Sequence, residues 1–350
     1  MLITDVPVDG WRRIVHVEDE AAGLNAIIAV HNDTLGPGCG GCRVYPYATF
    51  DDALDDVKNL SRGMTYKNAL GGIPFGGGKA VIIADARKDK TPAMFKAFGR
   101  ALNALEGLYY TAEDSGVTEH DLEIVKAESR FVGGIGVGGV GGNPSPFTAR
   151  GVWRGVQAAA RHHLGADSLS GARVAILGVG AVGGALAEHL HNEGARLVVA
   201  DVNLDAVNQM AERYGAVAVA PEDIAAADVD IFAPCALGGA INEETLAALK
   251  AKVVAGAANN QLATPAMDLA LREKGVLYAP DYVINAAGVI SVGLEILGRW
   301  TKEGLETRID RIGETLTSIF ERAHAEGRPT GAIADEMAQE AIERGRAAAE

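Results

Sequence analysis

The sequence is poor in cysteine, aromatic residues and positive charge, and it lacks a long hydrophobic run. Only 3 of its 350 residues are cysteines, an odd number that argues against a disulfide framework and favours a reducing, cytoplasmic setting. A net charge of −14 argues against nucleic acid or an anionic membrane as a partner. No apolar stretch approaches the roughly 20 residues that a membrane-spanning helix needs. The N-terminus, with Asp5 and Asp9, is not expected to be a signal peptide.

The composition is otherwise that of a globular protein. A chain of 350 residues with a hydrophobic fraction of 48% is long enough for two domains, each with its own core. Its 44 glycines suit tight turns and close packing of helices on sheets. We therefore expect two domains, and the two halves of the sequence differ in pattern.

The first half predicts an α/β domain. Residues 11–30 alternate well enough for two strands joined as a hairpin. Amphipathic patterns predict helices at 51–64 and 92–106, and a short strand is expected at 108–112. A further helix begins at Thr118, with a loose capping box.

Two lysines stand out in this half. Gly76, Gly77 and Gly78 remove three side chains directly before Lys79, and the apolar run 80–84 predicts a buried strand. Lys79 is expected at the entrance of that strand, where partial desolvation and the charge of a second lysine, Lys67, lower its pKa and suit it to act as a general base. A surface loop with solvated lysines is the alternative.

Other features of this half have two interpretations. Asp114 follows the strand at 108–112, a position common for catalytic acids, although a cap or surface carboxylate is the default. Residues 34–43 form a predicted loop with Cys39 and Cys42, which would be a redox pair or half of a zinc site. No nearby histidine completes a ligand set, so no metal is expected. The intervening glycines, Gly40 and Gly41, offer backbone N–H groups to an anion.

A glycine-rich stretch at 133–142 closes the first half. It matches Gly-x-Gly-x-x-Gly at Gly136, Gly138 and Gly141. No convincing strand precedes it, and Pro144 follows. We interpret the stretch as a loop or hinge rather than as a nucleotide site.

The second half contains a dinucleotide-binding fingerprint in its required context. A buried strand at 173–177 leads into a glycine-rich turn, a helix at 184–194 and a second strand at 196–200 that ends in Asp201. The turn consists of Gly178, Val179, Gly180, Ala181, Val182 and Gly183. The helix N-terminus is expected to carry the pyrophosphate, and Asp201 to bind the adenine ribose. Asp201 would repel a 2′-phosphate and the next two residues supply no cation, so NAD is favoured over NADP.

Strands and helices continue to alternate, which predicts a doubly wound parallel sheet. Loops at 235–239, 256–261 and 281–288 follow its strands and are expected to face the cofactor. Asn259 and Asn260 would bind nicotinamide, ribose or substrate there, or simply cap a helix. The last predicted helices are at 303–325 and 333–348. Since both domains need covering helices, this tail is a candidate to pack on the first domain.

Several motifs occur in the same order along the chain as in a known family. Through them the chain resembles the leucine/phenylalanine/valine branch of the Glu/Leu/Phe/Val amino-acid dehydrogenases, nearest to leucine dehydrogenase. The similarity runs essentially end to end. Its landmarks are residues 34–37, 62–67, 76–79, 143–146, 230–236 and 279–282. The resemblance implies a substrate and catalytic domain at 1–147 plus about 328–350, a Rossmann NAD-binding domain at 148–327, and a homo-oligomer.

The resemblance also implies roles for individual residues. Lys67 would hold the substrate carboxylate, and Lys79 and Asp114 would be the catalytic pair. The substrate site would further include Gly40, Gly41, Cys39, Met64, Ala112, Asn260, Val289 and Val292. Thr148, Ala236, Asn259 and Asn285 are expected to contact the cofactor together with the fingerprint and Asp201.

The implied reaction is NAD-dependent oxidative deamination of an L-amino acid to a 2-oxo acid and ammonia. Hydride leaves the substrate Cα, neutral Lys79 activates the water that attacks the iminium, and Asp114 shuttles protons. Small aliphatic pocket residues favour a branched-chain substrate such as leucine, valine or isoleucine. Cys39 stands where leucine dehydrogenases usually have Leu, which favours the alternative of phenylalanine or tryptophan. Rival hypotheses are a 2-hydroxy-acid dehydrogenase and a non-catalytic redox module that uses Cys39 and Cys42.

Overall fold

The computed structural model describes residues 1–136 and 143–349, and the chain divides into two compact units. Unit 1 comprises Met1–Asn143, Val289–Thr301 and Ala338–Glu350, and unit 2 comprises Pro144–Gly288 and Lys302–Met337. Unlike the boundaries expected from the sequence, residues 289–301 return to unit 1, and the chain passes from unit 2 to unit 1 within the last helix. Among the described residues, no helix is both long and apolar enough to cross a membrane.

Unit 1 is built on a mixed six-stranded sheet with the order β1-β2-β3-β5-β4-β6. The first three strands and β5 pair antiparallel, whereas β4 runs parallel to both β5 and β6. The predicted hairpin at 11–30 is confirmed as the β2–β3 pair. The strands are β1 (Leu2–Asp5), β2 (Arg13–Asp19), β3 (Leu24–Asn32), β4 (Gly38–Tyr45), β5 (Gly76–Ile83) and β6 (Tyr109–Ala112).

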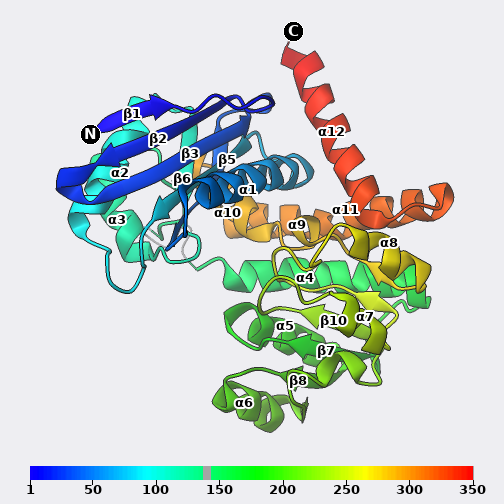
Figure 1. The fold of residues 1–350 in the computed structure, drawn as a ribbon. Coiled ribbons are helices and arrows are strands. Elements are labelled where there is room, and N and C mark those ends of the chain that lie inside the picture. Colours follow the sequence, from blue (N-terminus) through cyan, green and yellow to red (C-terminus); the bar gives the residue numbers. More distant parts are fainter. Residues whose placement is uncertain (137–142, 350) are drawn as a thin grey trace. The chain divides into compact units, whose positions relative to one another are not determined.

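Helices cover both faces of this sheet (Figure 1). On one face, Ala53 and Val57 of α1 pack with Val81 of β5, and on the other, Phe95 and Phe98 of α2 join the larger core. The helices of the unit are α1 (Phe50–Leu70), α2 (Pro92–Ala104), α3 (Glu119–Glu128), most of α10 (Ala287–Ile296) and the second part of α12 (Thr330–Ala349), with the 3-10 turn η1 (Glu20–Ala22).

Helix ends follow the local sequence. The predicted cap at Thr118 is confirmed as a full capping box with Asp121, and Thr49 and Asp52 form a second one at the start of α1. Helix α1 is longer than predicted and carries Lys67 in its last turn, where a lysine side chain lies near the negative end of the helix dipole.

Two strands differ from the sequence prediction. Residues 38–43 were expected to be loop but belong to β4, and β5 begins at Gly76 rather than at residue 80, so that Lys79 lies within the strand instead of at its entrance. Glycines hide the signal because they have low strand propensity and add no hydrophobic alternation. They are required by close packing: a Cβ at Gly77 would lie 1.9 Å from Thr65 Oγ1 of α1.

Unit 2 contains a parallel six-stranded sheet with the order β12-β11-β10-β7-β8-β9, which confirms the doubly wound prediction. Its strands are β7 (Arg173–Leu177), β8 (Arg196–Ala200), β9 (Val217–Ala218), β10 (Ile231–Pro234), β11 (Val253–Val254) and β12 (Leu277–Tyr278). Its helices are α4 (Ser145–Ala159), α5 (Ala181–Asn192), α6 (Leu204–Tyr214), α7 (Glu243–Ala248), α8 (Ala266–Glu273), α9 (Asp281–Ile284) and α11 (Lys302–Glu326), with the π-helical turn η2 (Ala160–Leu164) and the 3-10 turn η3 (Ile224–Ala226).

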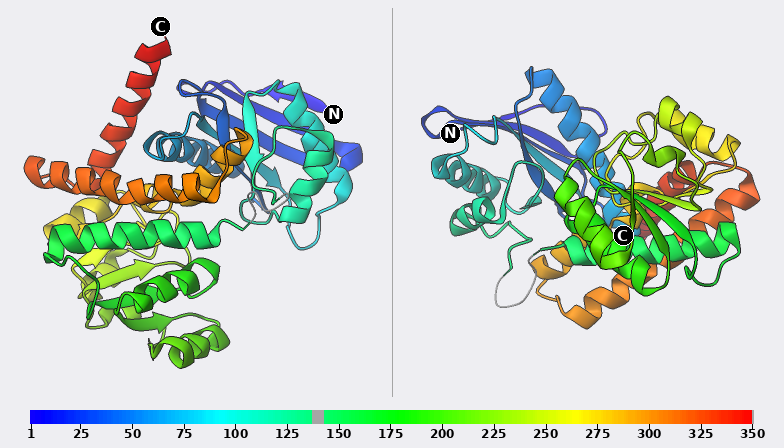
Figure 2. Two further views of the ribbon diagram at one scale, coloured as in Figure 1. Left: turned by 180° about the vertical axis from the view of Figure 1, so that it is seen from behind. Right: turned by 90° about the horizontal axis from the view of Figure 1, so that it is seen from below.

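Helices α4, α9 and α10 were absent from the sequence prediction, and α9 lies within the loop expected at 281–288. Pro146 lies in the first turn of α4, where a missing N–H costs no hydrogen bond, so this proline starts a helix. Helix α4 runs beside α11, as Figure 2 shows. The glycine-rich stretch interpreted as a hinge lies largely outside the described residues.

Candidate active site

Lys79 and Asp114 form an ion pair in unit 1. Lys79 extends from β5, Asp114 follows β6, and Lys79 Nζ lies 2.6 Å from Asp114 Oδ2. Both side chains are largely enclosed, with 8% and 18% of their surface exposed. The alternative of solvated lysines in a surface loop is therefore wrong for Lys79. A lysine and a carboxylate at this distance can pass a proton directly between them.

A second cation reaches the same carboxylate oxygen. Arg43 Nε of β4 lies 3.3 Å from Asp114 Oδ2. Burial opposes ionisation of Asp114, but the charges of Lys79 and Arg43 outweigh it and lower the pKa of Asp114 to about 2. Asp114 is consequently a carboxylate throughout the neutral and alkaline pH range.

Two adjacent glycines of β4, Gly40 and Gly41, let other groups approach the pair. A Cβ at Gly41 would lie 2.8 Å from Asp114 Cβ, and a Cβ at Gly40 would lie 2.9 Å from Met64 Cγ of α1. The predicted residues Gly40, Gly41, Met64 and Asp114 are thus brought together. Lys67 lies one turn beyond Met64 in the same helix and is half-buried.

Some of the residues that were predicted to contact the substrate side chain lie near the end of β6. A Cβ at Gly134 would lie 3.5 Å from Val292 Cγ2 and 3.8 Å from Ala112 Cβ, so these two predicted residues face one small region. Val289 lies one helical turn from Val292 in α10 and is half-buried. Cys39 has no exposed surface, and its contact with a substrate stays a prediction.

The cysteines of β4 do not have the environment of a redox pair. Cys39 and Cys42 are both buried and free. Burial raises the pKa of Cys39 to about 12 and raises that of Cys42 as well, so neither is a reactive thiolate. The described residues contain no cluster of His, Cys, Asp and Glu that could hold a metal ion.

The glycine-rich turn of unit 2 has the geometry of a phosphate-binding loop. Gly178 has a φ of +93°, and a Cβ at Gly183 would lie 1.9 Å from Gly178 O, so the first and third glycines are required by the turn and by helix packing. A Cβ at Gly180 would meet open space. Asp201 Oδ2 accepts the Val179 N–H at 2.7 Å, which places the carboxylate beside the turn.

The remaining predicted cofactor residues also lie in unit 2. Ala236 packs on Gly178: a Cβ added at Gly178 would lie 2.7 Å from Ala236 Cβ. Asn285 Nδ2 donates to Asn259 Oδ1 at 2.8 Å. Asn260, which was predicted to bind the substrate, has a φ of +52°, a strained conformation that concentrates at functional sites. Thr148 is in the first turn of α4.

The predicted residues therefore fall into two sets. The catalytic and substrate residues lie in unit 1 except for Asn260, and Asn260 and the cofactor residues lie in unit 2. Arg43 and its partner Asp56 of α1 were not predicted. The sequence did contain a signal for Arg43, which lies two residues after Gly41. The assignment of residues 34–43 to a loop obscured this signal, because it hid the strand that carries Arg43.

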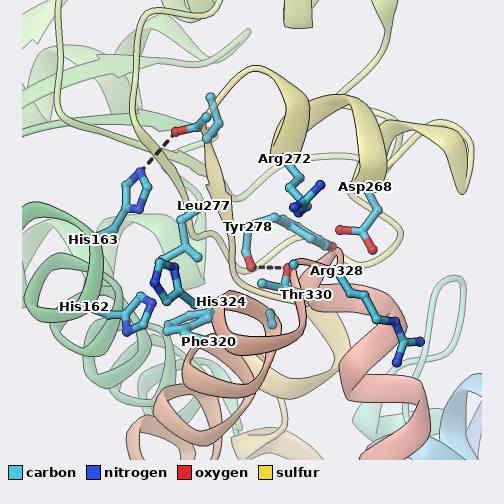
Figure 3. A pocket seen from close by; sticks show the side chains of 14 residues that line it. His162, His163, Asp268, Arg272, Leu277, Tyr278, Phe320, His324, Arg328 and Thr330 are labelled. Atoms are coloured by element: carbon cyan, nitrogen blue, oxygen red, sulfur yellow. Dashed lines mark hydrogen bonds between the residues drawn. The ribbon is translucent and has the colours of Figure 1, made fainter.

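A separate cavity of about 160 Å³ lies in unit 2 between η2, α8, β12 and α11 (Figure 3). None of the predicted site residues lines it. Two of its polar side chains hold the fold together: the Thr330 hydroxyl donates to Tyr278 O at 2.7 Å, and Arg328 pairs with Glu326 and Glu336. We assign this cavity no part in the reaction.

Asp268 in the wall of this cavity predicts a pH effect on stability. Its Oδ2 accepts the Ala332 N–H at 3.2 Å, but its Oδ1 is buried without a partner among the described residues, and burial raises its pKa from 3.8 to about 6. Folding therefore favours the protonated carboxyl group of Asp268. Its contribution to the free energy of unfolding is fully present below about pH 4 and is lost as the pH rises through 6. Asp268→Asn should raise Tm at pH 8 by about 2–4 °C.

Thermal unfolding followed from pH 4 to 8 measures this effect. The control is Asp167→Asn, since the side chain of Asp167 is 97% exposed. A lower Tm for Asp268→Asn at pH 8 than for the unsubstituted protein would contradict the prediction.

Known proteins are similar to this chain over nearly its whole length. The family model described as "Glu/Leu/Phe/Val dehydrogenase, dimerisation domain" matches residues 12–131, and the model "Glutamate/Leucine/Phenylalanine/Valine dehydrogenase" matches residues 199–347. A leucine dehydrogenase of Geobacillus stearothermophilus is 49% identical over 97% of this chain and 92% of its own length. A valine dehydrogenase of Streptomyces albus is 46% identical over 97% and 94%. The crystal structure of L-tryptophan dehydrogenase from Nostoc punctiforme superposes with a TM-score of 0.85 at 39% identity, covering 96% of this chain and 97% of that one.

Proposed function

Because the chain belongs to the Glu/Leu/Phe/Val dehydrogenase family and is an amino-acid dehydrogenase, we propose that it catalyses the NAD-dependent oxidative deamination of branched-chain L-amino acids. The products are the 2-oxo acid and ammonia. The observation that carries this proposal is the enclosed Lys79–Asp114 pair, with 2.6 Å between Nζ and Oδ2.

The chain's own residues account for the proton transfers. Lys67, a cation in the last turn of α1, pairs with the substrate carboxylate. Once Lys79 has lost its proton, its amine takes a proton from the water that attacks the substrate iminium. Asp114, held as a carboxylate, orients Lys79 and relays protons as ammonia leaves. When bound, NAD supplies the hydride acceptor.

Asp201 supports NAD as the cofactor within a family that uses NAD(P). Its carboxylate can accept the adenine ribose hydroxyls and repels a 2′-phosphate. Asp201→Asn keeps the oxygen that accepts the Val179 N–H but removes the charge. We expect the ratio of kcat/KM for NAD to that for NADP to fall at least about tenfold, since one lost charge interaction of about 1.4 kcal/mol is tenfold in rate. Initial rates with both cofactors measure it, and an unchanged ratio would contradict the role of Asp201.

A branched aliphatic substrate is supported by the residues around the end of β6. Ala112 and Val292 are small and apolar, and the relatives described above include leucine and valine dehydrogenases. The likeness to a tryptophan dehydrogenase favours the alternative of an aromatic substrate. One or two methylenes are worth only about 1–3 kcal/mol of discrimination, so we expect more than one substrate to be used.

A panel of amino acids tests the substrate proposal. NADH formation at alkaline pH is measured with L-leucine, L-valine, L-isoleucine, L-phenylalanine, L-tryptophan and L-glutamate. The highest kcat/KM should belong to an aliphatic substrate. A preference for phenylalanine or tryptophan would overturn the branched-chain assignment.

We also propose that the enzyme is a homo-oligomer, on the basis of the dimerisation-domain model that matches residues 12–131. The mass of the purified protein in solution, measured by light scattering, tests this. A mass of 36.3 kDa at assay concentration would be that of the single chain and would contradict the proposal.

A further inference from the structure

We propose that Arg43 is a positioning residue that keeps Asp114 fixed and charged while Lys79 gains and loses its proton, an inference that rests on the proposed function. Lys79 and Arg43 approach the same atom, Asp114 Oδ2, at 2.6 and 3.3 Å from two different strands. Of these two cations, only the lysine can give up its proton and act as a base, because a guanidinium is always protonated.

This asymmetry has a consequence for the reaction. When Lys79 is neutral and ready to act as a base, Asp114 has lost one of its two cations. Arg43 then remains as its charged partner, so the enclosed carboxylate is never left unpaired, a state that would be strongly unfavourable. The carboxylate thus stays in place, ready to take part in the next proton transfer.

Arg43 is itself held by a second anion. Its Nη1 donates to Asp56 Oδ2 of α1 at 2.9 Å, and the Tyr47 hydroxyl donates to the same oxygen. Asp114 and Asp56 raise the pKa of Arg43 despite the opposing effect of burial. The guanidinium therefore bridges a surface helix and the catalytic carboxylate, and its side chain is only 23% exposed.

The network itself consists of two cations and two anions. Lys79 and Arg43 are cationic, and Asp114 and Asp56 are anionic. Glu113, the neighbour of Asp114, has a pKa raised by burial and then by the charges of Glu119 and Asp114. Removing Arg43 makes the surroundings of Lys79 more negative, whereas removing the charge of Asp56 makes them more positive. The two changes should shift the protonation of the catalytic base in opposite directions.

The test is the pH dependence of kcat/KM for oxidative deamination of L-leucine with NAD, from neutral to alkaline pH. Arg43→Gln should lower kcat about tenfold or more and move the rising limb of the profile to higher pH by about half a unit or more. KM for L-leucine should change little, since the proposed role of Arg43 is to hold Asp114 and not to bind the substrate. Asp56→Asn should move the limb to lower pH, and Arg43→Lys should restore the limb of the unsubstituted enzyme.

Arg13→Gln is the matched control, because Arg13 pairs with Asp5 at 2.8 Å in the same unit and away from Asp114. Its profile should be that of the unsubstituted enzyme. Unshifted limbs, or shifts of Arg43→Gln and Asp56→Asn in the same direction, would overturn the role of Arg43. If Arg43→Gln does not fold, the profiles of Arg43→Lys and Asp56→Asn decide. An unsubstituted enzyme that is inactive on every amino acid tested would instead overturn the proposed function, and this inference with it.

Discussion

Replacing Lys79 by alanine is expected to lower kcat for deamination by about 10²–10⁴-fold, the usual contribution of a positioned general base. The fold should survive, because Asp114 keeps Arg43 as a charged partner at 3.3 Å. The binding of NAD should also survive, since the predicted cofactor residues lie in unit 2 and Lys79 in unit 1. Steady-state rates and a titration of NAD against the purified variant measure the two effects separately.

Lys90→Ala is the matched control for this experiment. Lys90 forms an ion pair with Asp121 in the same unit, and the two side chains are 20% and 10% exposed, comparable with the pair of Lys79 and Asp114. This substitution should lower Tm and leave kcat unchanged. If Lys79→Ala kept the full rate, the proposed base would be excluded.

The largest effect on stability is expected for Gly77→Ala. The new Cβ would lie 1.9 Å from Thr65 Oγ1, 2.4 Å from Thr65 N and 2.4 Å from Ser61 O. Two of these atoms are backbone of α1, so the helix itself would have to move away from β5. We expect a loss of about 3 kcal/mol or more in the free energy of unfolding, at or above the upper range for overpacking a core. Urea unfolding measures this loss.

The control lies in the same helix. A Cβ at Gly63 would meet nothing within 4 Å, and alanine is favoured over glycine within a helix by about 1 kcal/mol. Gly63→Ala should therefore be neutral or stabilising. Equal stabilities of Gly77→Ala and Gly63→Ala would show that α1 does not pack against β5 as closely as described.

The parts of the fold that were predictable are those with a repeated apolar pattern. Helix α1 buries Ala53 and Val57 on one face, and β7 and β8 are short apolar runs separated by a glycine fingerprint. The hydrophobic period identifies α1 as a helix, whereas β7 and β8 are recognised as strands by their short length, their β-branched residues and the glycine-rich turn between them. The parallel sheet of unit 2 was predicted from the alternation of strands and helices along the second half of the sequence.

The parts that were missed depend on tertiary contacts. Strand β4 begins Gly-Cys-Gly-Gly and has no apolar alternation, yet it pairs with β5 and β6. Helix α4 contains Gly151 and Gly155, which disfavour a helix locally; a Cβ at Gly155 would lie 2.4 Å from Ile284 Cγ1, so packing on α9 requires the small residue. Such neighbours are far apart in sequence.

The same distinction applies to the site. The pairing of Lys79 with Asp114 could be expected from the resemblance to a known family, and in the structure Lys79 Nζ lies 2.6 Å from Asp114 Oδ2. Arg43 was not predicted, because its role depends on which face of β4 it occupies and on Asp56 of α1 lying opposite. A pattern read along one segment contains neither fact.

The most direct test of the account is the stoichiometry of the reaction with L-leucine and NAD. NADH is followed by absorbance, ammonia by an enzymatic assay, and the 2-oxo acid by mass spectrometry. We predict that NADH, ammonia and the 2-oxo acid form in equal amounts. NADH formed without ammonia, or no NADH from any amino acid, would contradict the assignment of oxidative deamination to this site.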